Sequence, residues 1–280
     1  MNYANLHLHS TYSDGGFTPQ QLVLIGKSLG YGALALTDHE TDAGCEEFIH
    51  YAKKEGLEAI TGTEFYGSVN GHSIHLTALD FDPAAPSIRE FIKKRCDLQN
   101  AWVKRCVERG LELGYISGIT WDDVVFFSGE GAWLCIDSVY LALRLKKAMP
   151  LENFQDIRQN VFKAPEVKAI KHKSPPAEEV ISAVRQAGGI IALAHPDADM
   201  ADYIETLVNA GLNGIETCHP DISAEALPLA EEAARKYGLY HCGGKDHTGP
   251  MSCCDGKHAI PAFHGISEES FRILTERRLG

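Results

Sequence analysis

Seven short apolar runs, each with an acid or a histidine at or near its end, constrain this fold more than any other feature of the sequence. Helix-like stretches lie between several of them. Thr18 can cap a helix that has Pro19 at its first position, and residues 174–189 and 223–238 each end on glycine. Strands that alternate with helices indicate βα units around a mostly parallel sheet. The runs are residues 4–10, 32–40, 57–65, 72–81, 188–197, 211–220 and 238–247.

The first run contains two histidines in an apolar alternation, within the stretch NLHLHSTYSDGG at residues 5–16. Side chains of a strand point to alternate faces, so His7 and His9 are expected on one face, with Leu6 and Leu8 on the other. In a βα barrel, functional groups lie at the C-terminal ends of the strands, where these polar residues fall. Seven runs predict a barrel slightly short of eight strands.

One connection between runs predicts a hairpin instead of a βα unit. Asn70-Gly71 lies between apolar flanks, which is a strong signal for a two-residue turn. If Val69 pairs with His72, then Tyr66 pairs with His75, and Glu64 lies diagonal to His75 on the same face. Diagonal neighbours are about 7–8 Å apart at Cα, so the two side chains could share a metal ion.

Residues 85–175 break the alternation and are expected to form a helical insertion, whereas residues 1–84 and 176–280 form the barrel domain. Residues 88–114 and 137–149 each have the pattern of a helix. Between Arg89 and Arg109 there are seven Lys and Arg against three Asp and Glu, a local net charge of +4. This run is either a solvated helix face or a lid whose cations meet an anionic substrate over the barrel mouth.

Composition excludes several classes of protein. A formal net charge of −12 over 280 residues argues against a nucleic-acid polymer as the main partner, because phosphate backbones are bound by Lys and Arg. No apolar run approaches the roughly 20 residues of a membrane helix, and no signal peptide is recognisable at the N-terminus. The 8 cysteines form no CxxC pair and are expected to be reduced core residues. We therefore expect a cytoplasmic protein without a membrane partner.

The polar residues at the ends of the runs are carboxylates and imidazoles. One such histidine is usually a hydrogen-bonded core residue, but the repeated position is unusual. Burying so many ionisable groups at one end of a barrel would be very costly unless cations neutralised the carboxylates. Mixed imidazole and carboxylate ligands suit Zn, Mn or Fe. The residues are His7, His9, Asp14, Asp38, His39, Glu64, His75, His195, Glu216, His219, Asp246 and His247.

The order of these motifs resembles the PHP (polymerase and histidinol phosphatase) family, a metal-dependent phosphoesterase family related to amidohydrolases. The resemblance covers most of the chain, and SDGGFTPQQLV and GGIIALAHP strengthen it. Residues 85–175 correspond to the variable helical insertion of the family. The motifs are HxH (His7, His9), YSDG (Asp14), LTDH (Asp38, His39), GTE (Glu64), IHLTAL (His75) and LAHP (His195).

The resemblance implies a distorted (βα)7 barrel that holds two to three divalent metal ions (Mn, Fe or Zn). It assigns His7, His9, Glu64 and Asp246 to the first metal. Glu64 would bridge to a second metal held by His75 and His195. Asp14 and His39 would help to hold a third, and Asp38 would orient a neighbouring ligand, as carboxylates near metal sites commonly do.

The sequence departs from the family at two points. The last family motif is Gly-Ser-Asp-x-His-Gly, whereas this chain has GGKDHTG, with Thr248 in the place of the ligand histidine and His247 one residue early. A loop could bring His247 into the third site. The Arg-Pro-His segment of related small-molecule phosphatases is also missing from the insertion. Arg144, Lys146, Lys171 or His172 could bind the phosphate in its place.

These features predict a metal-dependent hydrolase of a phosphate ester, either a phosphatase or a phosphodiesterase, acting on a small phosphorylated metabolite such as a nucleotide or sugar phosphate. A hydroxide that bridges two cations would attack phosphorus. His219 or His247 is the candidate general acid for the leaving group. For His219 the alternative is a structural residue before Pro220, and Glu216 could line the substrate pocket or cap the sheet.

Other functions stay open as alternatives. Histidinol-phosphate phosphatase is a rival within the family, and hydrolysis of a carbon ester or amide is a different reaction on a similar metal scaffold. A polymerase-associated proofreading module is disfavoured by the acidic charge and by the absence of a polymerase-like portion. A non-catalytic metal-binding module would be expected to have lost ligands, whereas nearly the whole set is present.

Overall fold

The computed structural model of this chain describes residues 2–150, 153–246, 248–249 and 264–277. The predicted run 57–65 is divided at Thr61 into two strands, so the described residues form eight strands instead of seven. The side-chain hydroxyl of Thr61 donates to the carbonyl of Phe81 at this break. The strands are β1 (Ala4–Asn5), β2 (Ala33–Ala35), β3 (Glu58–Ile60), β4 (Gly62–Val69), β5 (His72–Leu79), β6 (Ile190–Leu193), β7 (Gly214–Cys218) and β8 (Tyr240–Gly243).

The strands pair into two sheets. One has three parallel strands in the order β1-β2-β3, and the other has five strands in the order β4-β5-β6-β7-β8. β5 is antiparallel to β4 and β6, whereas β6, β7 and β8 are parallel. A parallel bridge between His39 and Glu64 connects the two sheets at their functional ends. The prediction of an α/β protein is confirmed; among the described strands, the pairing forms two sheets and no closed barrel.

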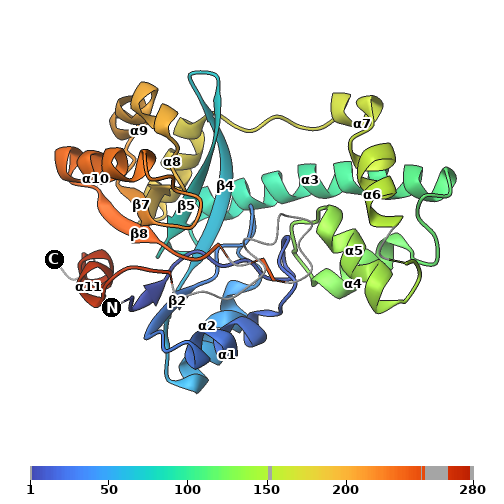
Figure 1. Cartoon of the computed structure of the whole chain (residues 1–280), viewed down its shortest axis with the longest axis horizontal. Helices are drawn as coiled ribbons and strands as arrows, with labels where there is room; N and C mark the ends of the chain where they lie inside the picture. Colours follow the sequence, from blue (N-terminus) through green and yellow to red (C-terminus); the bar gives the residue numbers. More distant parts are fainter. Residues whose placement is uncertain (1, 151–152, 247, 250–263, 278–280) are drawn as a thin grey trace.

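Helices cover the sheets and extend to one side of them (Figure 1). Thr18 caps α1 as predicted, with a reciprocal hydrogen bond to Gln21. The helices are α1 (Pro19–Ser28), α2 (Cys45–Glu55), α3 (Pro86–Glu112), α4 (Trp121–Ser128), α5 (Ile136–Leu145), α6 (Phe154–Ile157), α7 (Pro165–Ala169), α8 (Ala177–Gln186), α9 (Ile204–Asn209), α10 (Ala226–Tyr237) and α11 (Glu268–Glu276), with a π-helical turn over Arg158–Phe162 and a 3-10 helix over Ala198–Asp202.

The hairpin prediction is confirmed residue by residue. Val69 pairs with His72 and Tyr66 pairs with His75 across β4 and β5. The turn residues Asn70 and Gly71 have φ angles of 49° and 86°, both in the left-handed region that a type I′ turn requires. The turn chemistry therefore fixes which face of the hairpin carries Glu64.

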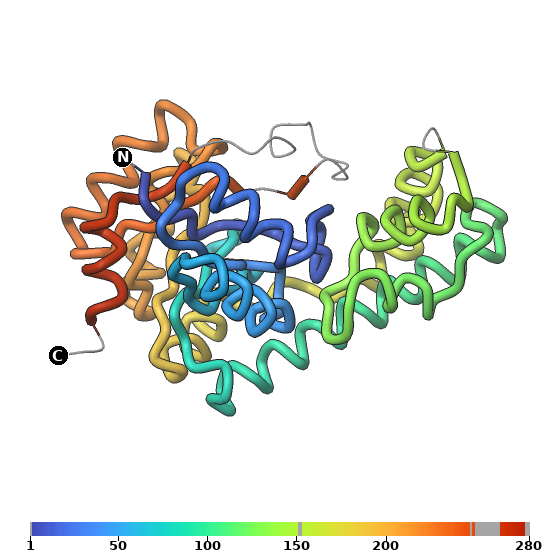
Figure 2. Tube along the Cα trace, turned by 90° about the horizontal axis from the view of Figure 1, so that it is seen from below, coloured from blue at the N-terminus to red at the C-terminus, as the bar shows by residue number. Residues whose placement is uncertain are grey.

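Helix α3 connects two hydrophobic cores. Near its start, Ile88 and Ile92 pack in the core beneath β4–β7, together with α8. Farther along, Val103 and Val107 pack in a separate core formed by α3–α7. In Figure 2 the helices that follow α3, up to residue 169, form a lobe beside the sheets. α3 runs from the sheets into this lobe. The lobe is thus fixed to the sheet domain through one long helix and its neighbouring segments.

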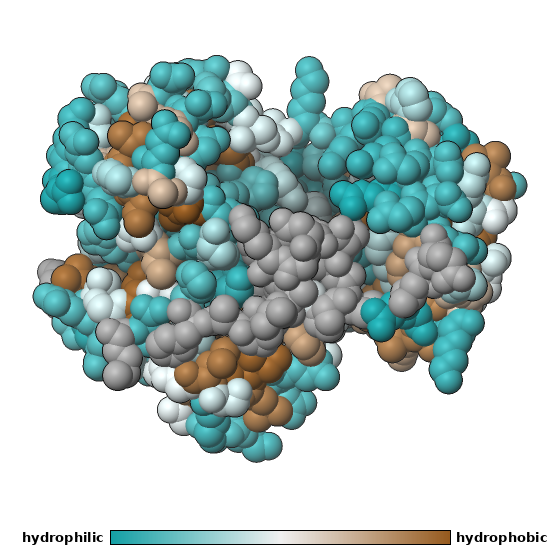
Figure 3. Space-filling model, in the orientation of Figure 1, coloured by the Kyte–Doolittle hydropathy of each residue, from teal (hydrophilic) through white to brown (hydrophobic). Residues whose placement is uncertain are grey.

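In the view of Figure 3 the surface of the described residues is mostly hydrophilic, with scattered apolar patches. Strongly exposed apolar side chains lie on separate helices, among them Leu24 on α1, Phe126 on α4 and Ile273 on α11. Within the described residues, every helix is too short or too polar to cross a membrane.

Candidate metal centre

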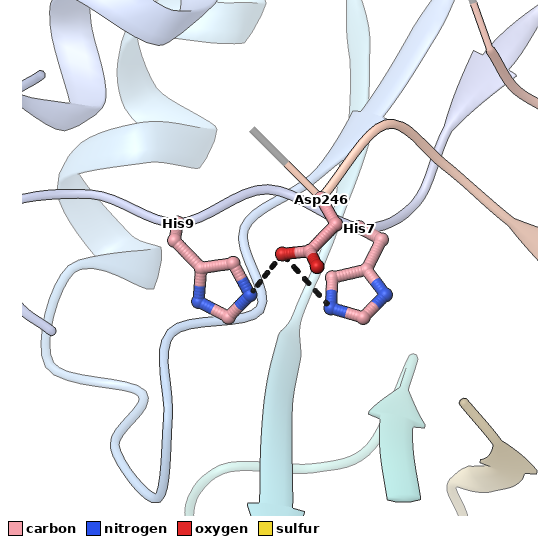
Figure 4. Close-up of side chains that lie close together, drawn as sticks. All are labelled: His7, His9 and Asp246. Atoms are coloured by element: carbon pink, nitrogen blue, oxygen red, sulfur yellow. Dashed lines mark ion pairs between the residues drawn. The ribbon is translucent and has the colours of Figure 1, made fainter. Parts of the chain in front are cut away.

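His7 and His9 follow β1 in a segment that is held by both backbone and side-chain hydrogen bonds. The N–H of Leu8 donates to Oγ1 of Thr37 at 3.0 Å, and the carbonyl of Leu8 accepts the N–H of Thr37 at 2.8 Å. The regular strand ends at Asn5, earlier than the sequence predicts. Both imidazoles nevertheless point the same way. Nε2 of His7 and Nε2 of His9 lie 3.8 and 3.1 Å from Oδ1 of Asp246 (Figure 4).

Glu64 on β4 lies at the centre of this cluster, with its side chain only 2% exposed. Its two carboxylate oxygens face different groups of histidines, three on one side and two on the other. The parallel bridge to His39 and the hairpin register bring these groups together. Oε2 lies 3.3 Å from Nε2 of His7, 3.3 Å from Nε2 of His9 and 3.1 Å from Nδ1 of His39, and Oε1 lies 3.0 Å from Nδ1 of His75 and 3.2 Å from Nε2 of His195.

Three of these nitrogens are the kind of buried polar atom that a metal ion would satisfy. Nε2 of His7, Nε2 of His9 and Nδ1 of His39 are buried and make no hydrogen bond within the described residues. Buried polar groups are normally hydrogen-bonded, so three unsatisfied nitrogens around one carboxylate need an explanation. Nitrogen and carboxylate donors at this spacing fit a divalent transition-metal ion.

The charges of the cluster are strongly coupled. Desolvation opposes ionisation of Glu64, but His7, His75 and His39 outweigh it and hold the pKa of Glu64 well below its usual value. In contrast, burial lowers the pKa of His39 to about 4, despite the nearby carboxylates. A neutral imidazole keeps a lone pair, so His39 is available as a ligand without first losing a proton.

Two further carboxylates, those of Glu216 and Asp38, support the imidazole rings through hydrogen bonds. Oε1 of Glu216 on β7 lies 2.7 Å from Nδ1 of His7, and its Oε2 accepts the backbone N–H of His195 at 2.8 Å. Asp38 accepts hydrogen bonds from the hydroxyls of Ser10 and Ser13, and the Ser13 hydroxyl lies 3.4 Å from Nδ1 of His9. Such partners fix ring orientation and tautomer in metal sites.

The role of Glu216 was the main omission of the sequence reasoning. The sequence predicts that Glu216 lines the substrate pocket or caps the sheet, whereas it is fully buried and contacts His7 directly. The signal that could have found it is its place in the chain. Glu216 is an acid inside the buried strand β7, at the same end of its sheet as the other acids and histidines.

Asp14 lies at the edge of the cluster, beside His9 and His39. Its Oδ1 is 3.5 Å from Nδ1 of His9, and its Oδ2 is 3.7 Å from Nε2 of His39. Thr248 is buried, and its Oγ1 makes no hydrogen bond within the described residues. His247, the predicted replacement ligand, lies outside the described residues.

His219 follows β7 and faces the cluster with a buried side chain. Its Nδ1 accepts the backbone N–H of Asp221 at 3.0 Å, so a neutral ring carries its proton on Nε2. That nitrogen lies 3.5 Å from Oδ2 of Asp246. Burial lowers the pKa of His219 in spite of the neighbouring carboxylates. Its position next to Asp246 brings it into the centre, where it can donate a hydrogen bond.

The helical lobe reaches the centre through Trp133. The Trp133 ring lies 5.3 Å from the His39 ring and 5.8 Å from that of Tyr66 on β4. Trp133 donates to Glu40, and Glu40 also forms an ion pair with Arg95 of α3. The other cations of α3 are exposed except Arg109, which is partly buried, and three of them pair with acids: Lys93 with Asp97, Arg105 with Glu108 and Arg109 with Glu166.

The predicted phosphate-binding residues of the insertion contact other parts of the lobe. Arg144 is exposed near the end of α5, and Lys146 pairs with Asp123 at 3.0 Å. Lys171 Nζ lies 4.8 Å from the ring centroid of Trp102. His172 lies 3.2 Å from a guanidinium nitrogen of Arg95 and 3.0 Å from Gln99 Oε1, so it reaches the centre indirectly, through Arg95 and Glu40.

Comparison with known proteins agrees with this geometry. The family model of the PHP domain matches residues 5–237, so the chain belongs to the PHP domain family. The predicted family is therefore confirmed, and so is the enzyme class that it implied, a phosphoric ester hydrolase. Among solved structures, the chain resembles a provisionally assigned metal-dependent phosphoesterase from Bifidobacterium adolescentis, with a TM-score of 0.80 and 26% identity over 98% of this chain and 95% of that one.

Curated relatives have several activities. The phosphoribosyl 1,2-cyclic phosphate 1,2-diphosphodiesterase of Eggerthella lenta is 26% identical over 248 residues, covering 88% of this chain and 94% of the relative. The 3′,5′-nucleoside bisphosphate phosphatase of Chromobacterium violaceum is 26% identical, over 88% and 87% of the two chains. The 5′-3′ exoribonuclease Rnm of Salmonella typhimurium is 28% identical, over 70% of this chain and 67% of the relative.

Proposed function

We propose that this protein hydrolyses a phosphate ester of a small phosphorylated metabolite, such as a nucleotide or a sugar phosphate, with the help of divalent metal ions. One observation carries the proposal. The two oxygens of Glu64 face two separate groups of imidazole nitrogens, each at 3.0–3.3 Å. A carboxylate between two groups of ligands is the arrangement expected where one acid bridges two cations.

The residues present fit two to three divalent ions, with Mn, Fe and Zn as candidates. His7, His9, Glu64 and Asp246 would hold the first ion, and Glu64, His75 and His195 the second. Asp14 and His39 would contribute to a third. When bound, such ions polarise phosphoryl oxygens and lower the pKa of a coordinated water.

Side chains of the protein orient the metal-binding histidines and supply a proton to the leaving group. Glu216 and the Asp38–Ser13 pair hold the rings of His7 and His9 in place. In hydrolysis, a water oxygen forms a bond to phosphorus, the ester P–O bond breaks, and a proton passes to the leaving oxygen. Nε2 of His219 lies 3.5 Å from Oδ2 of Asp246 and would hydrogen-bond that leaving oxygen. His219 in its protonated form, with Nδ1 released from the N–H of Asp221, is our candidate donor of the proton, with His247 as the alternative.

We also propose the distorted (βα)7 barrel as the arrangement that the two sheets approximate. The His39–Glu64 bridge between the sheets supports it. Residues 85–175 would be an insertion that covers the mouth of this barrel, with residues 1–84 and 176–280 as the barrel domain. The separate hydrophobic core of the helical lobe and the contact of Trp133 with His39 support that division.

A small substrate is favoured over a nucleic-acid polymer. Lys93, Arg105 and Arg109 of α3 are each paired with an acid, and the chain carries a net charge of −12. A continuous cationic surface that could bind a phosphate backbone therefore has little support. Because some relatives are named exoribonucleases, RNA is the alternative substrate that the experiment must include. Histidinol phosphate, and a carbon ester or amide, are the other substrates to include.

The test is hydrolysis of a panel of phosphate mono- and diesters by protein purified with Mn²⁺ supplied, followed as phosphate released from monoesters and as monoester or alcohol released from diesters, with short RNA in parallel. The proposal expects turnover of small esters that is abolished by a chelator and restored by added metal. Turnover of RNA alone, or of carboxylic esters alone, would contradict it.

A further inference from the structure

A small pocket borders the candidate metal centre beside β5 and β6. Its volume is about 140 Å³, and two of the candidate ligands, His75 and His195, form part of its wall. Their side chains are 28% and 24% exposed, the largest values among the candidate ligands that face Glu64. A group attached to a phosphate at the centre can therefore enter this pocket. The remaining lining residues are Ser73, Ile74, Leu193, Ala194, Pro196, Asp197 and Tyr203.

The lining has the chemistry of a sugar site. Apart from the two histidines, its one charged lining residue within the described part of the chain is Asp197. The hydroxyl of Tyr203 donates to Oδ1 of Asp197 at 3.3 Å, which orients the carboxylate. Ser73 adds a hydroxyl, whereas Leu193 and Pro196 add apolar surface. Hydroxyl groups donate readily to a carboxylate, and the C–H face of a sugar packs on apolar side chains.

Charge and size exclude two other occupants. A second phosphate group would be repelled by Asp197, and no lysine or arginine is among the described lining residues. Pockets that hold a whole drug-sized ligand are about 300–1,000 Å³, so a pocket of about 140 Å³ takes one part of a substrate. That part is the size of a single sugar unit, too small to include a nucleobase as well.

We propose that this pocket binds the hydroxyl-bearing leaving group of the ester, a pentose or hexose unit, and that Asp197 accepts a hydrogen bond from one of its hydroxyls. The inference rests on the proposed phosphoesterase function and names its substrate class, a sugar monophosphate or a sugar cyclic phosphate. Asp197 would be a specificity-determining residue, remote from the bonds that form and break.

The experiment compares two esters that differ in hydroxyl groups. The sugar ester is the best pentose or hexose phosphate of a panel, and the reference is an alkyl phosphate of equal carbon number. For Asp197→Asn we expect kcat/KM to fall about 10–100-fold with the sugar phosphate and to change less than twofold with the alkyl phosphate, since a hydrogen bond to a charged group is lost only in the first case.

Asp199→Asn is the matched control, because Asp199 is an exposed acid of the 3-10 helix that follows Asp197 and does not line the pocket. It should leave both esters unaffected. Equal changes of both esters in Asp197→Asn, or no change in either, would overturn the sugar site while the phosphoesterase activity of the wild type stands. A wild type that prefers the alkyl phosphate would overturn it as well. A wild type that hydrolyses no phosphate monoester or diester would refute the proposed function.

Discussion

Arg95 of α3 and Glu40 form a buried ion pair between the helical lobe and the loop that carries His39. Nε and Nη2 of Arg95 donate to the two oxygens of Glu40 at 2.8 and 3.2 Å, and both side chains are at most 6% exposed. Glu40 also has a φ of 47°, in the left-handed region. The pair therefore holds a strained segment next to the metal centre.

Removing one partner of this pair should destabilise the protein strongly. Arg95→Met leaves the Glu40 carboxylate buried without its cation, and the expected cost is about 3–5 kcal/mol in the free energy of unfolding. Lys93→Met is the matched control, because Lys93 pairs with Asp97 on the exposed side of the same helix, and its loss should leave the free energy of unfolding nearly unchanged. Urea denaturation measures both. Equal losses in the two variants would show that the buried pair has no special role.

Glu216 should control metal affinity without being a ligand. Glu216→Gln keeps the shape of the side chain but weakens the interaction with Nδ1 of His7, so metal affinity should fall about 10–100-fold. Competition with a chromophoric chelator measures this directly. Glu205→Gln, at an exposed position of α9, should bind metal as the wild type does. Wild-type affinity in Glu216→Gln would remove this residue from the support of the site.

The two ligand groups around Glu64 should be separable. His195→Ala should abolish turnover and release the metal on the His75 side, whereas Glu64→Ala should release metal from both sides. Metal content per chain and phosphate release are measured on the same preparations, with circular dichroism to verify folding. Full activity with unchanged metal content in either variant would exclude that residue from the site.

The lowered pKa of His172 makes the stability of the protein depend on pH. Burial, with help from Arg95, lowers the pKa of His172 to about 4. In the unfolded chain its pKa is about 6.5, so the unfolded state binds the proton first as the pH falls. Stability is therefore full above pH 6.5, declines between pH 6.5 and 4, and then levels off for this group.

The measurement is a pH series of unfolding free energies for wild type and His172→Gln. His172 is half-buried, so solvent screening limits its share of the decline to about 1 kcal/mol. The variant should lose that share, whereas the control His50→Gln, at an exposed position of α2, should follow the wild type. Parallel curves for wild type and His172→Gln would contradict the assignment.

Local chemistry made part of the fold predictable. The Asn70-Gly71 turn fixes the register of β4 and β5 by itself, because both residues accept a positive φ, and the pairing of Tyr66 with His75 follows from it. The helix over residues 88–114 was also predicted, and it appears as α3. Both features depend on residues close together in the chain.

Features that depend on distant residues were not predictable. The early end of β1 at Asn5 is not visible in the sequence, because the partners of the segment that follows lie far away in the chain: Leu8 is bonded to Thr37, and His7 to the backbone of Asp246. Arg95 belongs to a run of cations that resembles a solvated face, and only its contact with Glu40, 55 residues away, buries it. The contact of Glu216 with His7 likewise joins residues 209 positions apart.

The central claim is a two-cation centre around Glu64 that hydrolyses phosphate esters. The most direct measurement is metal per chain by elemental analysis of protein purified with Mn²⁺ supplied, with phosphate release assayed on the same sample. We expect two or more ions per chain together with chelator-sensitive turnover. One ion or none, or two ions without hydrolysis of any phosphate mono- or diester, would contradict the account.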